Sequence, residues 1–184
     1  VKDLVEKHGL GLMIDYGEGE KVTPIAKACW DGREEIVRYL LEKGADPNGF
    51  SGSDKSTPLL EAVKRDRASI VSLLIEKGAK VNTKDSREMT PINSAAAAGN
   101  VEIVQMLRRL LRPEILVKAK ANLQSETYGL TPLAFAIAAK KPELVKRLVE
   151  LGANVNHASK MNGQTALMGA ILQGDAEMVQ LLLS

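Results

Sequence analysis

Few side chains in this sequence are of the types that perform chemistry, and their positions keep them apart. The two histidines, His8 and His157, lie near opposite ends of the chain, and the single cysteine is Cys29. We expect the histidines to be surface residues, since widely separated side chains cannot share a metal ion or a catalytic dyad. No histidine lies near Cys29 in the sequence, so we expect a buried structural thiol rather than an activated nucleophile.

Two further patterns are weak candidates for chemistry. The stretches Gly9-Leu10-Gly11 and Gly17-Glu18-Gly19 lack the third glycine and the strand-then-helix context of a phosphate-binding loop, so we expect turns there. The neighbouring acids Glu34 and Glu35 would diverge by about 100° on a helix. They suit the start of a helix, where carboxylates complement the dipole. We therefore expect no catalysis, no metal and no cofactor.

The composition excludes several classes of protein. With 25 Lys and Arg against 23 Asp and Glu, the net charge is only +2. That balance argues against a nucleic-acid partner, which normally requires a basic excess. No apolar run reaches the length of a membrane span, so we expect no membrane insertion. One cysteine permits no internal disulfide, which favours a reducing, cytoplasmic location.

One local charge cluster is an exception to this balance. Arg108, Arg109, Arg112 and Lys118 face a single nearby acid, Glu114. Guanidinium groups suit carboxylate or phosphate, so this cluster is a candidate anion-binding site. The alternative interpretation is a solvated helix face.

A repeating pattern positions these residues. Thr-Pro recurs at Thr23, Thr57, Thr90 and Thr131, and a degenerate Thr-Ala follows at Thr165, at intervals of 34, 33, 41 and 34 residues. A Gly-Ala-x-x-Asn motif recurs in phase with it. Two motifs that hold the same phase over several copies indicate an internal repeat.

Each repeat predicts two helices and a loop. Threonine is a good N-cap and proline is favoured at the first helical position, so Thr23-Pro24 predicts a helix over 24–31. Gly32 ends it, and a second amphipathic helix starts at about Glu34 and ends at a left-handed Gly44. The residues that follow, up to Ser56, predict a turn or short hairpin. Neither helix can bury its apolar face within one unit, so neighbouring units must stack into a solenoid.

These motifs, together with Gly-Asn-Val-Glu-Ile-Val at 99–104, resemble the ankyrin-repeat family over residues 18–184. The resemblance implies an all-α ankyrin-repeat solenoid of helix-turn-helix units with protruding loops or short hairpins. We expect a single domain, 1–184, with a partial repeat at 1–17, repeats at about 18–51, 52–84, 85–125 and 126–159, and a truncated repeat at 160–184. An insertion at 110–119 accounts for the 41-residue interval.

The sequence departs from the family pattern at one position in every repeat and at a second position in two of them. The family often has a histidine two residues after the proline, and the matching residues here are Ala26, Leu60, Asn93, Ala134 and Met168. We expect the hydrogen bonds made through that histidine to be absent. The glycine between the two helices is replaced by Asp66 and Lys140.

In the family, loop tips and first helices form a concave face that binds another protein or a peptide segment. The matching partner-binding residues are Trp30, Arg65, Arg87, Met89, Tyr128, Leu130, Met161 and Leu172. We expect Met89, Tyr128, Leu130 and Met161 to be substantially exposed on one face. Trp30 is a candidate hot spot, because tryptophan is enriched among the residues that dominate binding at interfaces. The alternative is that it has a structural role and caps the partial N-terminal repeat.

The main functional hypothesis is a monomeric protein–protein interaction module without catalysis, lying within a longer chain. A second hypothesis is a targeting or substrate-recruiting domain from a larger enzyme or a bacterial effector, which would place it in the host cytoplasm. The missing initiator Met fits an excised segment. A third is recognition of an acidic or phosphorylated ligand by the basic insertion.

Overall fold

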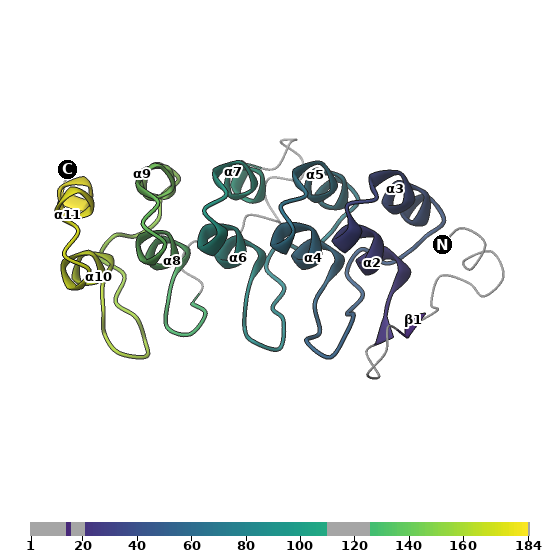
Figure 1. The fold of residues 1–184 in the computed structure, drawn as a ribbon, viewed down its shortest axis with the longest axis horizontal. Helices are drawn as coiled ribbons and strands as arrows, with labels where there is room; N and C mark the ends of the chain where they lie inside the picture. The colour runs from purple at the N-terminus through teal and green to yellow at the C-terminus, as the bar shows by residue number, and fades with distance from the viewer. Residues whose placement is uncertain (1–13, 16–20, 110–125, 184) are drawn as a thin grey trace.

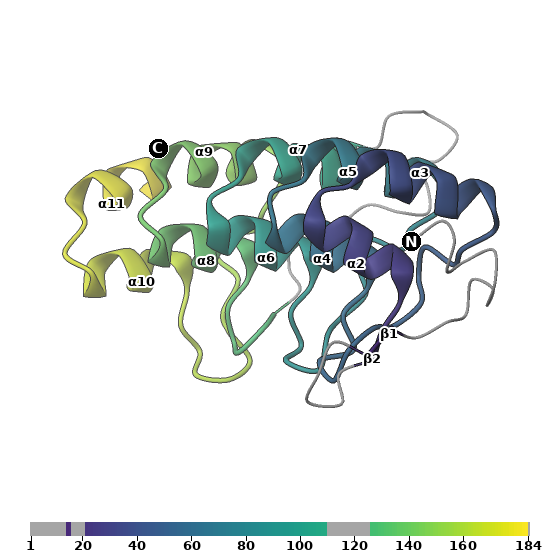
Figure 2. The same ribbon diagram turned by 45° about the vertical axis from the view of Figure 1, so that its right-hand side comes forward.

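The computed structural model describes residues 14–15, 21–109 and 126–183, in which ten helices form five successive pairs. The pairs stand side by side in chain order, with one row made of the first helices and a second row made of the second helices (Figure 1). The connecting loops project from the row of first helices, away from the second helices (Figure 2). This arrangement confirms the all-α ankyrin-type solenoid.

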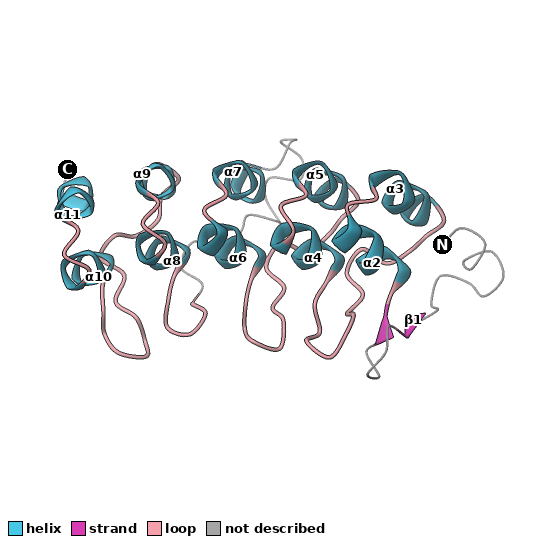
Figure 3. Cartoon of the chain, in the orientation of Figure 1, coloured by secondary structure: helices cyan, strands magenta, loops and turns pink. Residues whose placement is uncertain are grey.

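The first helices are α2 (Pro24–Asp31), α4 (Pro58–Lys64), α6 (Pro91–Ala98), α8 (Pro132–Ala138) and α10 (Ala166–Leu172). The second helices are α3 (Glu34–Glu42), α5 (Ala68–Glu76), α7 (Val101–Arg109), α9 (Pro142–Glu150) and α11 (Ala176–Leu183). Strand structure in the described residues is limited to the short antiparallel pair β1 (Ile14–Asp15) and β2 (Lys21–Val22) (Figure 3). Two later loops each contain one isolated antiparallel β-bridge, which joins Ser51 to Ser56 in one loop and Thr127 to Leu130 in the other.

A threonine caps every first helix, as the sequence predicts. The Oγ1 atom of each accepts a hydrogen bond from the backbone N–H three residues on, at 3.3 Å in all five repeats. Thr165 makes this bond even though Ala166 replaces the proline. Each cap of this kind contributes about 1 kcal/mol, so the repeat motif directly stabilises the row of helices that carries the concave face.

One core position shows how the repeats depend on each other. Six residues after each capping threonine, Cys29, Val63, Ala96 and Ile137 are all buried, at 0–2% exposure, against the next repeat. Ile171 holds the same position in the last pair and is 58% exposed. Burial, with a smaller effect from the Glu61 charge, raises the pKa of the Cys29 thiol. Cys29 is therefore a structural thiol, as predicted.

Left-handed residues make the turns between helices. Gly44, Gly78 and Gly152 end second helices at φ of 87–90°, which confirms the predicted caps. Between the two helices of a pair, Gly32 and Gly99 have φ of 73° and 79°. Asp66 and Lys140 adopt the same region at 56° and 52°. The turn therefore keeps its geometry without glycine, at the cost of backbone strain.

Two predicted features lie outside the described residues. The second helix of the third repeat is described to Arg109, so its predicted extension to Arg112 and the insertion at 110–119 are not covered. Of the partial repeat at 1–17, only Ile14 and Asp15 are described, and they form β1.

Lys140 offers a test of the strained turn. Lys140→Gly is expected to raise the free energy of unfolding by about 0.5–1 kcal/mol, since relief of left-handed strain exceeds the added chain entropy. Chemical denaturation followed by circular dichroism measures the change. Lys140→Ala, which removes the charge but keeps Cβ, should give little gain. An equal gain from both variants would assign the effect to the lysine side chain instead.

Candidate protein-binding groove

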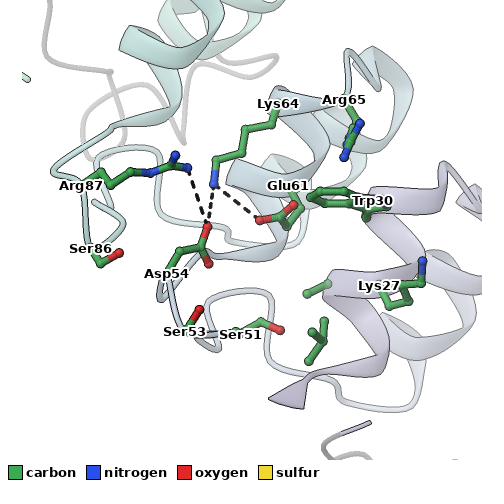
Figure 4. A pocket seen from close by; sticks show the side chains of 13 residues that line it. Lys27, Trp30, Ser51, Ser53, Asp54, Glu61, Lys64, Arg65, Ser86 and Arg87 are labelled. Carbon is green, nitrogen blue, oxygen red and sulfur yellow. Dashed lines mark hydrogen bonds and ion pairs between the residues drawn. The ribbon is translucent and has the colours of Figure 1, made fainter. Parts of the chain in front are cut away.

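An open groove of about 730 Å³ lies between the first helices and the loops of the first three repeats. Helix α2 contributes Ala26, Lys27 and Trp30, and helix α4 contributes Glu61 and Lys64, with Arg65 as the residue that caps its C-terminal end. The loops contribute the remaining lining residues, which are Val22, Ser51, Gly52, Ser53, Asp54, Ser86 and Arg87. Figure 4 shows these side chains around the hollow. Three of the predicted partner-binding residues, Trp30, Arg65 and Arg87, therefore line one cavity.

Lys64 joins the loops at the base of the groove. Its Nζ lies 3.1 Å from Asp54 Oδ2, 3.3 Å from Asp85 Oδ2 and 3.6 Å from Glu61 Oε1. Asp54 and Asp85 belong to the loops of successive repeats, and the Ser86 N–H also donates to the Asp54 carbonyl at 2.7 Å. The half-buried ammonium thus holds two neighbouring loops in a common position.

The charge of Lys64 is strongly favoured in this setting. Burial by itself disfavours the ammonium, but the carboxylates of Glu61, Asp54 and Asp85 outweigh it. The pKa of Lys64 therefore lies above its ordinary value of 10.5.

Trp30 and Arg65 form one wall of the groove. The Arg65 guanidinium carbon lies 3.5 Å from the centroid of the Trp30 ring, within the range of a cation–π interaction. Trp30 remains 41% exposed, and Arg65 is also exposed. Figure 4 shows the Arg65 group over the indole, beside Glu61 and Lys64. The contact fixes the plane of the guanidinium and leaves both residues accessible to a partner.

Glu61 is the least exposed polar residue of the lining after Ser51. It is 7% exposed, and its Oε2 atom is buried without a hydrogen bond from any described residue. A buried acceptor without a donor is costly, and it marks a place where an external donor would stabilise the site.

A second hollow of about 230 Å³ lies further along the concave face, bordered by Leu130, Ala138, His157 and Leu172. Tyr128, Met161 and Leu172 are exposed, at 58%, 74% and 73%. Met89 and Leu130 are only partly exposed, so the expectation of substantial exposure is wrong for these two residues. Each directly precedes a helix-capping threonine, Thr90 or Thr131, and therefore lies at the base of its loop rather than at the tip.

The comparisons with known proteins agree with this geometry. A family model for ankyrin repeats in three copies matches residues 48–110 and 108–184, and one for a single ankyrin repeat matches 21–49. This chain belongs to the ankyrin-repeat family. Ankyrin repeats are protein–protein interaction modules and typically lack catalytic activity.

Three relatives illustrate the range of ankyrin proteins similar to this chain. The mouse (Mus musculus) "Protein fem-1 homolog A-like" is 26% identical over 147 residues, which is 80% of this chain and 16% of that protein. The mouse "Ankyrin repeat and SOCS box protein 11" is 33% identical over 94 residues, 50% of this chain and 26% of that protein. The Arabidopsis thaliana "Putative E3 ubiquitin-protein ligase XBAT31" is 34% identical over 94 residues, 50% and 19%. The chain thus spans only a minor part of these relatives.

Two polar contacts between ankyrin repeats were not anticipated from the sequence. Asn93, one of the residues in place of the family histidine, donates from Nδ2 to Thr127 Oγ1 at 2.6 Å. Thr127 in turn donates to the Glu88 carbonyl at 2.7 Å. The expectation that these bonds are absent is therefore wrong at Asn93, because an amide reaches the next loop from the same helical position.

His157 joins the loop before α8 to the loop before α10 rather than lying free on the surface. Its Nε2 lies 2.8 Å from Glu126 Oε1, and the Lys160 N–H donates to both oxygens of that carboxylate. The hydrogen bond with His157 is the main cause that lowers the pKa of Glu126. A histidine and an acid 31 residues apart, close to one repeat, could have signalled this contact.

The basic cluster is only partly described. Arg108 donates from Nη2 to the Leu151 carbonyl at 3.0 Å, where it satisfies the C-terminal end of α9. The Arg108 side chain is half-buried, and this hydrogen bond links the third ankyrin repeat to the fourth. The Arg109 side chain, Arg112 and Lys118 lie outside the described residues. In the described residues there is no cluster of metal ligands and no helix long and apolar enough to cross a membrane.

Lys64 tests whether charge maintains the groove. Lys64→Met is expected to lower the free energy of unfolding by about 2–3 kcal/mol, because it removes the cation that Glu61 and Asp85 share and leaves Asp85 only the exposed Arg87 at 3.8 Å. The decrease falls at the low end of the range for buried pairs because the Lys64 side chain is still 18% exposed. Urea unfolding near neutral pH measures it, and Lys64→Arg, which keeps the charge, is the control.

The pH dependence of that difference identifies its cause. A raised pKa in the folded state means that the contribution of Lys64 is complete below pH 10.5 and is lost as the pH rises through the folded-state pKa. The difference between parent and Lys64→Met should therefore be constant near neutral pH and narrow in the alkaline range. A difference that does not change at alkaline pH would show that Lys64 acts through packing alone.

Proposed function

We propose that this ankyrin array is a non-catalytic interaction module that holds an extended segment of a partner protein in the groove of its first three repeats. The observation that carries the proposal is the groove itself, in which Trp30, Arg65 and Arg87 converge from two helices and a loop. Indole and guanidinium groups are the side chains most often found at binding hot spots. The Lys64 ion pairs support the proposal because they hold the loops before a partner arrives, which reduces the ordering cost of binding.

The partner contact extends along the concave face in this proposal. Tyr128, Met161 and Leu172 are exposed towards the C-terminal end, and Met161 lies in the loop that packs on Gly129. Met89 and Leu130 lie at the bases of their loops, and the exposed parts of their side chains also contact the partner. These apolar residues give a partner additional contact area, while the N-terminal groove provides the specific polar contacts.

The names of two relatives favour a second, compatible candidate. One is named as an E3 ubiquitin-protein ligase and one as a SOCS box protein, and this chain corresponds to a minor part of each. A substrate-recruiting domain of a larger protein would use the same groove. Its test is whether the full-length natural protein transfers ubiquitin to the groove-bound partner, and whether Trp30→Ala in that full-length protein abolishes the transfer.

The binding site is tested with peptides selected from a random dodecapeptide phage library on the parent protein. Trp30→Ala is expected to weaken the best synthetic peptide at least about tenfold, equivalent to about 1.4 kcal/mol, in isothermal titration calorimetry. Val149→Ala, on helix α9 outside the groove and about as exposed as Trp30 (36% against 41%), serves as the control and should change the affinity little. A peptide that binds Trp30→Ala normally but loses affinity for Leu172→Ala would move the site to the C-terminal hollow.

A further inference from the structure

We infer that the groove selects partner segments that carry an acidic side chain, whose carboxylate binds the Arg65 guanidinium where it lies on Trp30. This inference rests on the proposed function and specifies the chemistry of the partner. It starts from two polar groups of the groove whose bonding capacity is unused, one a donor and one an acceptor.

The donor is Arg65. Its guanidinium contacts the face of Trp30 at 3.5 Å, and no described carboxylate forms an ion pair with it. Stacking uses the face of the group, whereas its five N–H donors point outward from the edge. The ring holds the plane in one orientation, so the fork that fits a carboxylate in a bidentate manner is already arranged.

The acceptor is Glu61 Oε2. The side chain is 9% exposed, and this oxygen makes no hydrogen bond with a described residue. Figure 4 shows Glu61 between Lys64 and Trp30. A backbone N–H of a bound segment would satisfy it. An extended peptide provides an acidic side chain and a backbone N–H close together. One segment can therefore pair with the Arg65 guanidinium and donate a hydrogen bond to Glu61 Oε2.

The charge of the lining favours an acid over a base. Lys64 is already surrounded by three carboxylates, and Arg87 reaches only those same acids, at 3.8 and 4.0 Å. Arg65 and the outer part of Arg87, which is 63% exposed, therefore present positive charge to the groove.

The neighbouring acids also favour a carboxylate over a phosphate. Glu61 and Asp54 line the same groove as Arg65. Their negative charge repels a dianionic phosphate more strongly than a carboxylate with a single charge. We therefore assign Asp or Glu as the recognised residue.

The test uses a random dodecapeptide phage library selected in parallel on the parent and on Arg65→Gln. The parent should enrich Asp or Glu at one position of the selected peptides, and Arg65→Gln should lose that preference. Trp30 is the single tryptophan of the chain, so its fluorescence reports occupancy of the groove when the peptides lack tryptophan.

The best synthetic peptide then enters a double-mutant cycle. Replacing its acidic residue with the neutral amide should weaken binding to the parent at least about tenfold, and to Arg65→Gln by less than about twofold. Arg38→Gln is the matched control, because Arg38 is exposed on α3 outside the groove and pairs with Glu34 of the same helix. It should bind the peptide as the parent does. Circular dichroism establishes that each variant is folded.

Each contrary outcome has a distinct meaning. Peptides that need Trp30 but show no acidic preference, and that Arg65→Gln binds normally, would overturn this inference and leave the proposed function intact. Tighter binding when phosphoserine replaces the acid would overturn the assignment of a carboxylate. Failure to enrich any peptide, or enrichment of peptides that bind independently of Trp30, would overturn both.

Discussion

Each pair of helices in this protein has apolar residues on the flanks that face its neighbours, and a pair cannot cover those flanks by itself. The residue six positions after each capping threonine is buried wherever another pair follows and is exposed at Ile171, where none is described. Burial of that flank is therefore a property of neighbours and not of a single repeat. The row of first helices, and with it the concave face, exists because this stacking places helix α2 beside α4 and α4 beside α6.

Stacking alone leaves the loops without a defined position, and polar contacts between repeats provide it. Lys64 joins the loops of the second and third repeats, Thr127 joins the fourth to the third, and the Lys160 N–H joins the fifth to Glu126 of the fourth. The Lys64 and Thr127 side chains are partly or fully buried, so their bonds are protected from competing water. The loops that frame the groove are thus held by the same contacts that link the repeats.

The groove joins this rigid base to an accessible wall. Lys64 has its charge satisfied by three acids below, while Arg65, the next residue, lies on Trp30 with its donors directed outward. Adjacent residues therefore have opposite roles at the end of α4, where Lys64 is the last helical residue and Arg65 is the C-cap. Lys64 maintains the site and Arg65 is available to a partner.

The sequence by itself determined the repeat, the helix boundaries at Thr23 and Gly32, the left-handed glycines and the buried state of Cys29, since these follow from caps, turns and periodicity within a few residues. It also placed Trp30, Arg65 and Arg87 on the concave side through the register of the repeat. Only the tertiary structure decided that Arg65 stacks on Trp30, that Glu61 is buried with an unused acceptor, that Asn93 bonds the next repeat, that His157 pairs with Glu126, and that Arg108 caps α9. Each of these contacts joins groups about 30 or more residues apart in the chain or depends on burial by a neighbouring repeat, and local sequence rules carry no information about such distances.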